Sequence, residues 1–527
     1  MVIESFSHDG NLTLANYERV FRLGGNLRAV YNSFWLSSTV TLLALALGVP
    51  LGWLLTRTDL PYKGGFLILS TTPYFIPPFV KAISWIQTFG PVGFFNRLLM
   101  YMTGSSEPLV NIYSEWGVAF VLTVHFYPVV LMTVAAALVS IDSSFEESAR
   151  LAGASNFTIA RRITLPLIAP AVAASSLLVF LLTIEDVGVT AFIGSRVNFF
   201  VMPTLVYRLI NTPDIPGAIV VSVWLVLVAL VMIVLHRRIL GRERRFTTFS
   251  GKAHRPGLIS LRAWKRPMLI VVIVFTTLLV IVPTSSLFLA AFMKYIGAPL
   301  SWKSLTTANF QYILFEYPET QRALVNSFLL GVVGSSIALL TALVVSYANV
   351  RLHLKVASVI EMLGSLPIAI PGIVLGVAMI LTWSREPFNI YGSIWILLVG
   401  YLARYLPFGL QSTKASLQQV DTSLEEAGRV SGAGWLTIMR RILIPILKSG
   451  LFAGWLLMFM LMFRDLTLSI MLSSSGTETI GAAVFDLQEG GYWELSAALA
   501  SLVFIVTMTG IYLLRRVTGR EGGLWVD

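Results

Sequence analysis

Apolar runs long enough to cross a lipid bilayer recur along the whole chain. Examples are LIVVIVFTTLLVIVPTSSLFLAAF from Leu269 and FLLGVVGSSIALLTALVVSYA from Phe328. A transmembrane helix needs about 20 predominantly apolar residues, and both runs meet that length. Only 12% of the residues are charged and the mean hydropathy is +0.78, whereas soluble domains carry about 25% charged residues. The sequence therefore predicts an all-α polytopic membrane protein, since a β-barrel would show short alternating segments instead.

Eleven spans are predicted from the apolar runs and from the turn signals between them. They fall near residues 32–55, 65–88, 116–139, 167–185, 217–236, 268–292, 323–347, 356–383, 391–414, 446–471 and 496–514. With this number of crossings, the loops 186–216 and 473–494 lie on one side of the membrane. The polar stretches 142–166 and 421–445 lie on the other side, together with the linker between the two halves.

Basic residues are concentrated in the linker between the fifth and sixth predicted spans. The segment 236–267 carries ten Lys and Arg residues and one acid, whereas the loop 473–494 carries four acids and no Lys or Arg. Cytoplasmic loops are enriched in Lys and Arg, so the linker is predicted to be cytoplasmic. This placement accounts for the net charge of +11 without a nucleic-acid partner, and it favours contact with anionic membrane lipid. The chain has no cysteine, which excludes disulfides, thiolate metal sites and cysteine nucleophiles.

The two halves of the chain repeat one another. NSF at Asn32 recurs at Asn326, and the polar stretch 142–166 recurs 279 residues later as 421–445. Six predicted spans separate the two polar stretches, so both face the same side of the membrane. The repeat is therefore parallel, unlike the inverted repeats of many secondary transporters.

This repeat predicts four parts of the chain: an outside amino-terminal segment at 1–31, a first repeat at 32–240, a basic cytoplasmic linker at 241–267 and a second repeat at 268–527. The amino-terminal NLTLANYERVF matches SLTTANFQYIL, which follows the opening span of the second half. The first half therefore has no counterpart of that opening span. We expect either that the true start lies upstream or that this helix has been lost.

The two polar stretches, DSSFEESARLAGASNFTIARRITLP and DTSLEEAGRVSGAGWLTIMRRILIP, each predict a helix, a turn and a second helix. A Ser or Thr three residues before each Glu of a Glu-Glu pair predicts capping boxes, at Ser143–Glu146, Ser144–Glu147, Thr422–Glu425 and Ser423–Glu426. Gly153 and Gly432 supply the turn. A second amphipathic helix then leads through two arginines to Pro166 and Pro445, which open the next span. The alternative is an interfacial helix that only anchors the loop.

The same two stretches match the cytoplasmic signature of binding-protein-dependent ABC importer permeases, and the chain resembles that family in both halves. The signature runs Glu-Ala-Ala, three residues, Gly, nine residues, Ile-x-Leu-Pro. The matching residues are Glu147-Ser148-Ala149, Gly153, Ile163 and Leu165-Pro166 in the first half, and Glu426-Ala427-Gly428, Gly432, Ile442 and Ile444-Pro445 in the second. The departures replace small residues with small residues and Leu with Ile.

The resemblance implies two parallel repeats of the type I, MetI-like permease fold in a bacterial inner membrane. In that family the short helix is a coupling helix, which docks on a separate ATP-binding subunit and turns nucleotide-driven closure into motion of the spans. Two copies in one chain imply two ATP-binding subunits, with a periplasmic or lipid-anchored solute-binding protein outside. The implied coupling residues are Glu146, Glu147, Ala149, Gly153, Arg161, Pro166, Glu425, Glu426, Ala427, Gly432, Arg440 and Pro445.

The sequence lacks the motifs expected of an ATPase or of another enzyme. It contains no P-loop pattern, no Gly-x-Gly-x-x-Gly and no His-Glu-x-x-His, and its five histidines form no cluster. We therefore expect a permease subunit that is not an enzyme, holds no cofactor or metal site, and depends on another subunit for ATP hydrolysis. Two alternatives of another class are a secondary transporter, which needs no ATPase, and a membrane-embedded enzyme, which needs catalytic groups converging at one depth.

Ionisable residues inside spans are candidates for a translocation pathway. The candidates are Glu185, Asp186, Glu361, Arg404, Arg464 and Asp465. The competing interpretation is that the pairs Glu185-Asp186 and Arg464-Asp465 only mark the outer ends of spans. A pairing of Glu361 with Arg404 across the bundle is a further hypothesis. The proline pairs in PYFIP and PIAIP are candidates for hinges or for packing kinks.

Fused permeases with two repeats resemble the ferric iron group of the family. The segments EDVGVTAFIGS and RDLTLSIMLSSSGTETIGAAVFDLQEGGYWELSAALASL are similar to outside segments of that group. The resemblance therefore implies ferric iron as the transported solute. Thiamine, 2-aminoethylphosphonate and polyamine are the alternatives that it leaves open.

Overall fold

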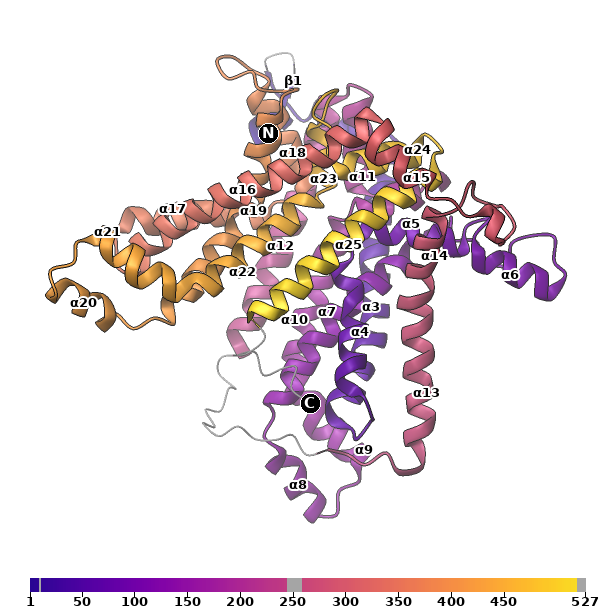
Figure 1. Ribbon diagram of the computed structural model, residues 1–527, viewed down its shortest axis with the longest axis horizontal. Helices are drawn as coiled ribbons and strands as arrows, with labels where there is room; N and C mark the ends of the chain where they lie inside the picture. The colour runs from indigo at the N-terminus through magenta and orange to yellow at the C-terminus, as the bar shows by residue number, and fades with distance from the viewer. Residues whose placement is uncertain (9–10, 244–257, 519–527) are drawn as a thin grey trace. The chain divides into compact units, whose positions relative to one another are not determined.

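The computed structural model describes residues 1–8, 11–243 and 258–518, and this part of the chain is almost entirely helical (Figure 1). The sheet that it contains is a hairpin of two short strands near the amino terminus, β1 (Ser7–His8) and β2 (Asn11–Leu12). These findings confirm the predicted all-α fold. Residues 244–257 of the predicted basic linker lie outside the described part of the chain.

The chain forms two compact units, which meet in sequence after Thr306. The first unit contains the first half of the chain and also α13 (Lys265–Thr276) and α14 (Val282–Ala291), which are joined by the π-helical segment η5 (Thr277–Ile281). Within this unit, α14 packs against α5 (Pro78–Phe89). The four-part division expected from the repeat stays a prediction.

Three long helices form the centre of the first unit, because α3 and α7 pack along each other and α10 lies against both. Of the most apolar 18-residue window of α7, 83% is buried. The main helices are α2 (Ala15–Arg22), α3 (Gly24–Arg57), α4 (Lys63–Phe75), α6 (Phe94–Thr103), α7 (Glu115–Ser140), α8 (Ser143–Leu151), α9 (Asn156–Ile159), α10 (Leu165–Ile184), α11 (Met202–Asn211) and α12 (Ile215–Glu243).

The second unit repeats this arrangement, with α16, α19 and α22 packed against one another and α25 lying against α22. The matching helices support the parallel repeat predicted from the sequence. The main helices are α16 (Pro318–Val350), α17 (Lys355–Ser365), α18 (Gly372–Trp383), α19 (Ile394–Gln418), α20 (Ser423–Val430), α21 (Trp435–Ile438), α22 (Ile444–Phe463), α23 (Thr467–Leu472), α24 (Ile480–Glu489) and α25 (Trp493–Thr518).

The described residues contain nine helices that are long and apolar enough to cross a membrane, and two sharply bent helix pairs that bring the number to as many as 11. The bends measure 104° between residues 75 and 78 and 115° between residues 369 and 372. They occur at PYFIP and PIAIP. A proline lacks the N–H needed for a helical bond and pushes the preceding residue into an extended conformation. Ile76 and Ile370 adopt that conformation, so the helix stops and restarts after each second proline.

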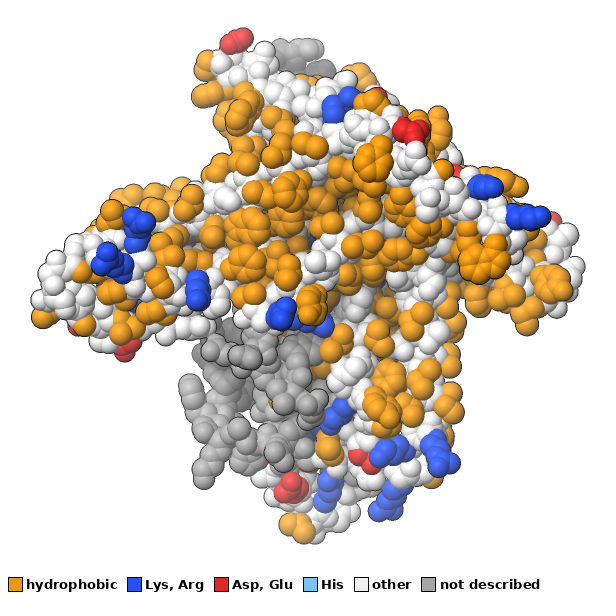
Figure 2. Space-filling model, viewed as in Figure 1, with side chains coloured by type: hydrophobic (Ala, Val, Ile, Leu, Met, Phe, Trp, Pro, Cys, Tyr) orange, Lys and Arg blue, Asp and Glu red, His pale blue; other side chains and the backbone are white. Residues whose placement is uncertain are grey.

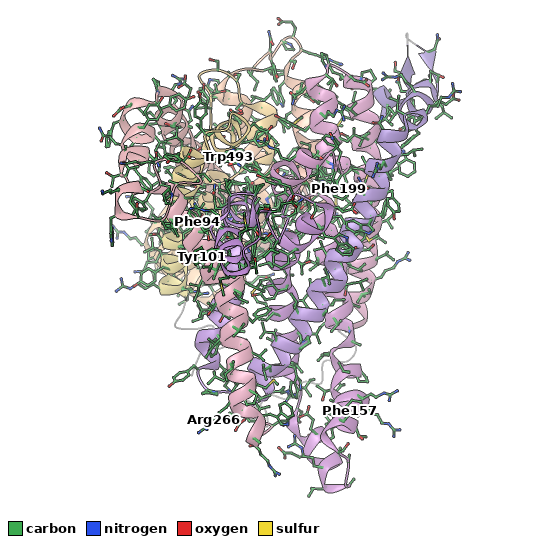
Figure 3. The ribbon with its side chains drawn as sticks, turned by 90° about the vertical axis from the view of Figure 1, so that its right-hand side faces the viewer. Phe94, Tyr101, Phe157, Phe199, Arg266 and Trp493 are labelled. Atoms are coloured by element: carbon green, nitrogen blue, oxygen red, sulfur yellow. The ribbon has the colours of Figure 1, made fainter. Side chains whose placement is uncertain are left out.

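The side chains of the first unit follow the expected membrane pattern. In Figure 2, hydrophobic side chains cover the exposed length of α13, and basic side chains gather at its lower end. Figure 3 places Arg266 and Phe157 at the same end of the unit, while Tyr101 on α6 lies well away from that end. This distribution agrees with a cytoplasmic position for the basic linker.

The repeated Asn-Ser of the NSF motif anchors a short outer helix in each half. The asparagine amide and the serine hydroxyl bind the backbone just before and at the start of α11 and α24, where helical N–H groups have no partner of their own. The bonds run from Asn32 Nδ2 to Phe200 O (2.8 Å), from Met202 N to Ser33 Oγ (2.7 Å), from Asn326 Nδ2 to Glu478 O (2.9 Å) and from Ile480 N to Ser327 Oγ (2.8 Å). The motif therefore recurs because each half has a short helix whose start is held by the same two hydrogen bonds.

Candidate coupling site

The two polar stretches, here called the coupling segments 142–166 and 421–445, each begin with a short helix, α8 and α20. Both helices begin where the sequence predicts, but the capping boxes predicted at Ser144, Thr422 and Ser423 are wrong, and the side chain of Ser143 lies outside the described part of the chain. An aspartate accepts the backbone N–H two residues ahead instead, which leaves the serines inside the first turn. The bonds run from Ser144 N to Asp142 Oδ1 (2.9 Å) and from Ser423 N to Asp421 Oδ1 (2.8 Å). The bond from Ser423 N is the main cause that lowers the pKa of Asp421.

Each short helix ends at a glycine in the left-handed conformation, with φ of +83° at Gly153 and +80° at Gly432. A residue with a Cβ adopts this conformation at a cost of about 1–2 kcal/mol. Beyond the helix end, the N–H of Ala433 donates to Gly428 O, as in a glycine-terminated helix. In the described part of the chain, no atom lies within 4 Å of a Cβ added at either position. The turn therefore requires glycine for its backbone angle and not for space.

After the turn, each coupling segment continues without a break into the next span. One helix runs from Phe157 to Ile184 and the other from Trp435 to Phe463, and they pass through the π-helical segments η1 (Ala160–Thr164) and η9 (Met439–Leu443). The prediction of a separate second helix ahead of the two prolines is therefore wrong. A π turn has wider hydrogen bonding and accommodates a proline that has no N–H. Each short helix is thus joined through its glycine turn to a long helix that crosses the membrane.

The two acids of each Glu-Glu pair point in different directions. Glu146 and Glu425 are buried, whereas Glu147 and Glu426 are exposed. Consecutive residues of an α-helix are about 100° apart around its axis, so one acid faces the protein when the other faces solvent. Of the glutamates implied as coupling residues, Glu147 and Glu426 are therefore accessible to a partner, whereas Glu146 and Glu425 face the permease itself.

In the first half, Glu146 lies against Arg57, the last residue of α3. Glu146 Oε1 is 3.6 Å from Arg57 Nη2 and accepts a hydrogen bond from Thr164 Oγ1 at 2.8 Å. The side chains of Arg57 and Glu146 are only 1% and 4% exposed. Buried charges are retained when they are paired, so this contact joins the coupling segment to the end of the first span.

In the second half, Glu425 makes the equivalent contact with Arg351, which directly follows α16. Arg351 Nε donates to Glu425 Oε1 at 2.7 Å, and Tyr347 OH donates to Glu425 Oε2 at 3.2 Å. Arg351 Nη2 also donates to Leu417 O (3.1 Å) and Val420 O (2.6 Å) at the end of α19. This arginine therefore holds three chain segments together.

An apolar cluster lies beneath the second coupling segment. It joins the ends of α16 and α19 to α21, η9 and α22 through the buried side chains of Tyr347, Leu417, Val420, Ile438, Met439, Leu443, Leu447 and Leu451. Burial of apolar surface stabilises such a junction by roughly 25 cal/mol per Å². The second coupling segment is therefore packed on the spans that surround it.

Large apolar side chains stand exposed at matching positions of both coupling segments. They are Phe145, Leu151 and Phe157 in the first half, and Leu424, Val430 and Leu436 in the second. Leu151 is 92% exposed and Val430 is 89% exposed, and exposed apolar groups rimmed by charge are typical of interaction sites. Sequence reasoning missed these residues, although the aligned apolar positions were a signal that pointed to them.

The other predicted coupling residues lie at or near the same surface. Ala149 is half-buried, and the remaining ones are exposed: Arg161, Pro166, Ala427, Arg440 and Pro445. The two halves therefore present the same residue types on the same short helix, with an exposed acid, an exposed apolar tip and a pair of arginines where the span begins.

A family model described as the binding-protein-dependent transport system inner membrane component matches the chain twice, at residues 45–245 and 334–520. These matches cover more than half of the chain and include both coupling segments. The chain belongs to this family. It is a permease subunit of an ABC importer and a multi-pass protein of the bacterial inner membrane, as the resemblance implied.

Two curated relatives named as iron permeases align with the permease over almost its whole length, and a third relative aligns with part of it. A ferric transport system permease protein FbpB from Actinobacillus pleuropneumoniae is 26% identical over 95% of this chain and 73% of the relative. An Fe(3+)-transport system permease protein FbpB 2 from Haemophilus influenzae is 23% identical over 92% of this chain and 89% of the relative. A putative 2-aminoethylphosphonate transport system permease protein PhnV from Salmonella paratyphi A is 24% identical over 38% of this chain and 76% of the relative.

Solved structures show a weaker likeness to the permease. A bacterial ABC transporter involved in the import of the acidic polysaccharide alginate aligns with 49% of this chain and 98% of its own chain, at 16% identity and a TM-score of 0.39. At that score the likeness adds nothing to the family assignment.

Two of the pathway candidates are helix caps in the permease. The carboxylate of Asp186 accepts N–H groups of Val189 and Thr190 at 2.9 and 3.3 Å. Asp465 likewise accepts those of Leu468 and Ser469 at 2.8 and 3.2 Å. Both aspartates are buried directly beyond the ends of α10 and α22 and begin the next short helix. Their half-buried neighbours are Glu185 and Arg464. This geometry favours the interpretation that these pairs mark span ends, and a role in the pathway stays a hypothesis.

The second-half aspartate also belongs to a polar cluster. Tyr405 OH donates to Asp465 Oδ2 at 2.5 Å, and Arg404 Nε lies 3.9 Å from the same oxygen. The guanidinium of Arg404 packs against Gly372, the first residue of α18, where any added Cβ would collide with it. The glycine at the second bend therefore makes room for an arginine from α19.

Glu361 does not pair with Arg404, so that hypothesis is wrong. Glu361 is bound instead by Lys414 Nζ at 2.6 Å and by Asn349 Nδ2 at 2.5 Å. Glu361 lies on α17, before the 115° bend, whereas the guanidinium of Arg404 lies against the first residue after the bend. The bend therefore separates the two side chains.

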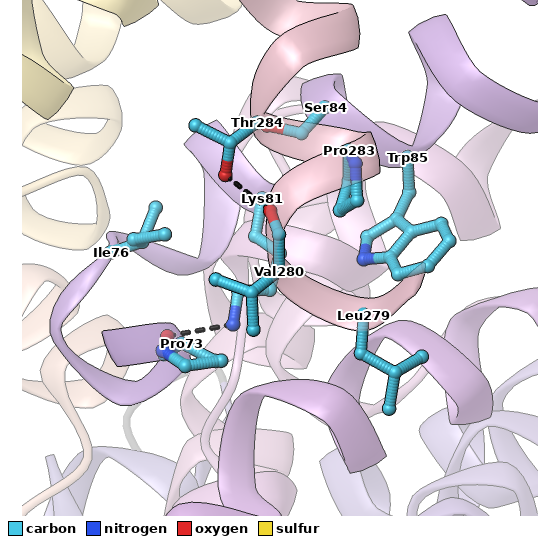
Figure 4. A pocket seen from close by; sticks show the side chains of 9 residues that line it. All are labelled: Pro73, Ile76, Lys81, Ser84, Trp85, Leu279, Val280, Pro283 and Thr284. Carbon is cyan, nitrogen blue, oxygen red and sulfur yellow. Dashed lines mark hydrogen bonds between the residues drawn. The ribbon is translucent and has the colours of Figure 1, made fainter. Parts of the chain in front are cut away.

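Lys81 is a buried cation that the sequence analysis did not single out, although it interrupts the apolar run FVKAISW. Its side chain points toward the first bend, where Nζ donates to Pro73 O at 2.7 Å and lies 3.5 Å from Val124 O (Figure 4). A cavity of about 10 Å³ beside it is lined by Val280 and Pro283, among others, and this is about the space of one water molecule. The lysine therefore binds backbone oxygens near the break in the helix.

The basic linker ends at a fixed point on the first unit. The N–H of Ile259 donates to Arg57 O at 2.8 Å, and that of Asp59 donates back to Ile259 O at 3.2 Å. The Asp59 carboxylate accepts Leu261 N at 2.9 Å and Lys265 Nζ at 3.3 Å, and the Leu261 bond is the main cause that lowers the pKa of Asp59. Among the described residues, no group of three or more His, Cys, Asp or Glu residues could hold a metal ion.

Proposed function

We propose that the two coupling segments bind two copies of an ATP-binding subunit, and that the permease imports ferric iron supplied by an external solute-binding protein. The observation that carries the first part is the duplication of one exposed surface. Each coupling helix displays an acid, an arginine and an apolar tip, which are Glu147, Arg150 and Leu151 on α8 and Glu426, Arg429 and Val430 on α20.

This surface has the composition of a protein interface. Apolar anchors that become fully desolvated carry most of the energy of an interface, and a polar rim surrounds them. Leu151 and Val430 supply the anchors, because they are the most exposed large apolar residues on the two segments. The adjacent acid and arginine supply the rim, and the continuous helix behind each turn carries displacement into the membrane.

Ferric iron is favoured by the relatives that match both repeats. Those named as ferric transport permeases cover 95% and 92% of this chain, whereas the 2-aminoethylphosphonate relative covers 38%. 2-Aminoethylphosphonate is therefore the second candidate, and thiamine and polyamine stay as alternatives. Selection of the solute would fall to the external binding protein.

The stoichiometry of the purified complex tests the docking proposal. The permease is expected to copurify with two ATP-binding subunits. Leu151→Asp and Val430→Asp are each expected to lose one of them, because a charge replaces the apolar anchor, and the double variant is expected to lose both. Native mass spectrometry in detergent counts the subunits directly.

Tyr62→Asp is the matched control for this experiment. Tyr62 is 81% exposed in the turn after α3 and lies outside the coupling segments; its positive φ of 58° is one that Asp tolerates. This variant is expected to keep two ATP-binding subunits. A parent complex without any such subunit, or a double variant that keeps both, would refute the docking proposal.

Uptake by cells that lack the chromosomal permease gene tests the solute. Cells carrying the permease on a plasmid are expected to accumulate radiolabelled ferric iron, and cells without it are not. Radiolabelled 2-aminoethylphosphonate is expected to enter both at the same rate. Permease-dependent entry of the phosphonate without entry of iron would overturn the iron assignment and leave the docking proposal untouched.

A further inference from the structure

The buried acids of the coupling segments are held from inside the permease. We propose that Glu146 with Arg57, and Glu425 with Arg351, are positioning residues that lock each coupling helix to the end of the first span of its half. The inference rests on the proposed function, because it assigns these pairs a part in carrying motion from the ATP-binding subunits. We call each Glu–Arg pair a latch.

The second latch joins three helix ends at one point. Arg351 follows α16, donates to Glu425 on α20, and donates to the backbone oxygens of Leu417 and Val420 at the end of α19. The planar guanidinium presents several donors in a fixed fork, so it fixes the angle of the helix and not only its distance. Since α20 also leads through Gly432 into α22, displacement of α20 moves α16 and α22 together.

The first latch consists of the same residue types, an arginine and a glutamate, but it has fewer hydrogen bonds. Arg57 Nη2 and Glu146 Oε1 are 3.6 Å apart, and no hydrogen bond satisfies the Arg57 side-chain nitrogens in the described part of the chain. The carboxylate is instead bound by Thr164 at the start of the following span. The two latches are therefore unequal, and the second holds its coupling helix more firmly than the first.

A pair of adjacent glutamates offers a matched test of this role. The chain has no cysteine, so spin labels can be placed on two introduced cysteines without background. With His353→Cys after α16 and Ser431→Cys after α20, both at exposed positions, pulsed electron paramagnetic resonance measures the distance between the span end and the coupling helix. Glu425→Gln is expected to broaden that distance distribution, whereas Glu426→Gln is expected to leave it unchanged. An unchanged distribution in Glu425→Gln would overturn the latch.

The corresponding labels in the first half are Tyr62→Cys and Ala152→Cys, both at exposed positions. In the parent chain, the distance distribution of this first-half label pair is expected to be broader than the distance distribution of the second-half label pair. Glu146→Gln is expected to broaden it by less than Glu425→Gln broadens the other, because fewer bonds are lost. A narrower first-half distribution would contradict the inequality of the latches.

A double variant separates positioning from stability. Glu425→Gln leaves Arg351 buried without its charged partner, which is destabilising, whereas replacing both with apolar residues is often neutral or stabilising. Arg351→Met with Glu425→Leu is therefore expected to restore the amount of folded permease. It is not expected to restore the ratio of radiolabelled ferric iron taken up to ATP hydrolysed. That ratio is expected to stay about tenfold below the value for the parent permease, which is within the usual range of coupling between sites.

Recovery of uptake per ATP together with stability would show that the pair is only structural, and would overturn the proposal. The label distances are measured on the permease alone. Failure to bind an ATP-binding subunit would therefore refute the proposed function without altering the distances, and unchanged distances would refute the latch without affecting subunit binding.

Discussion

Gly432 fixes the direction of the second coupling helix through a single backbone angle. Gly432→Ala is expected to lower the free energy of unfolding of the purified permease by about 1–2 kcal/mol, since Ala must adopt the left-handed conformation. Gly432→Asn is expected to cost less, because Asn adopts that conformation more readily. Denaturant titration in detergent measures the difference.

Gly434→Ala is the control for this substitution. Gly434 has φ of −71°, and in the described part of the chain nothing lies within 4 Å of an added Cβ. Because Gly434 is the N-cap of α21, where Ala is less favourable than Gly, some loss is expected, but a smaller one than at position 432. Equal losses at positions 432 and 434 would contradict the assignment of the turn to a backbone angle.

Asp421 makes the start of α20 sensitive to acid. Its pKa is lowered chiefly by the N–H of Ser423, so its contribution to stability is present above the pKa of the unfolded chain, near about 4. That contribution is lost as the pH falls through the lowered pKa. A spin label at Ser431→Cys is therefore expected to become more mobile as the pH falls below about 4.

Asp421→Asn is the comparison for the pH series. The amide oxygen accepts the same N–H and does not titrate, so the label is expected to keep the same mobility over this range. A transition of the same size in both variants would show that another group is responsible.

At the scale of helices, the bend before α18 depends on a close contact between α18 and α19. Gly372→Ala is expected to displace the Arg404 guanidinium, because the added methyl overlaps it; since this group is the end of a flexible side chain, the loss of stability is expected to stay below about 1 kcal/mol. The double variant Gly372→Ala/Arg404→Ala has no such overlap. Its loss of stability is therefore expected to be smaller than the sum of the losses in the two single variants. Denaturant titration of the four chains gives the coupling energy.

Gly64→Ala provides the opposite control. Gly64 lies in α4, and in the described part of the chain nothing lies within 4 Å of an added Cβ, so Ala is expected to stabilise that helix by roughly 0.5–1 kcal/mol. If the losses at positions 372 and 404 add exactly in the double variant, the methyl group added at position 372 does not contact the Arg404 side chain.

The sequence predicts the spans and the coupling helices because both are local patterns. Apolar runs locate the nine candidate spans and the two bent helix pairs of the described residues, and Gly153 and Gly432 give the turns with their positive φ. The prolines locate the two bends but do not fix angles of 104° and 115°, since these depend on which helices pack on either side. A proline in the first turn predicts a helix start, and the π turns that carry the helix through it have no sequence signal of their own.

The direction of the first glutamate in each pair is also beyond local reasoning. Its partner, Arg57 or Arg351, ends a span far away in the sequence. Nothing in either local sequence indicates that the two meet, so both acids of a pair look equally available to solvent. The capping boxes failed for a local reason, because the carboxylates of Asp142 and Asp421 accept the N–H groups of Ser144 and Ser423.

At the scale of the whole permease, duplication is what connects structure to function. The repeat gives the chain two copies of one coupling segment, and each copy has a buried Glu–Arg pair that joins it to its own half. The halves are not identical, because the Arg351–Glu425 contact has hydrogen bonds that the Arg57–Glu146 contact lacks. If both segments bind an ATP-binding subunit as proposed, the two bound subunits rest on coupling helices with different numbers of internal hydrogen bonds.

The most direct test of ATP-driven import through the coupling segments is uptake of radiolabelled ferric iron into proteoliposomes that contain the permease, its ATP-binding subunit and its binding protein. Accumulation is expected only with ATP on the side of the coupling segments, and it is expected to be lost in the Leu151→Asp/Val430→Asp double variant. Accumulation that follows an ion gradient without ATP, or that persists in the double variant, would contradict the account.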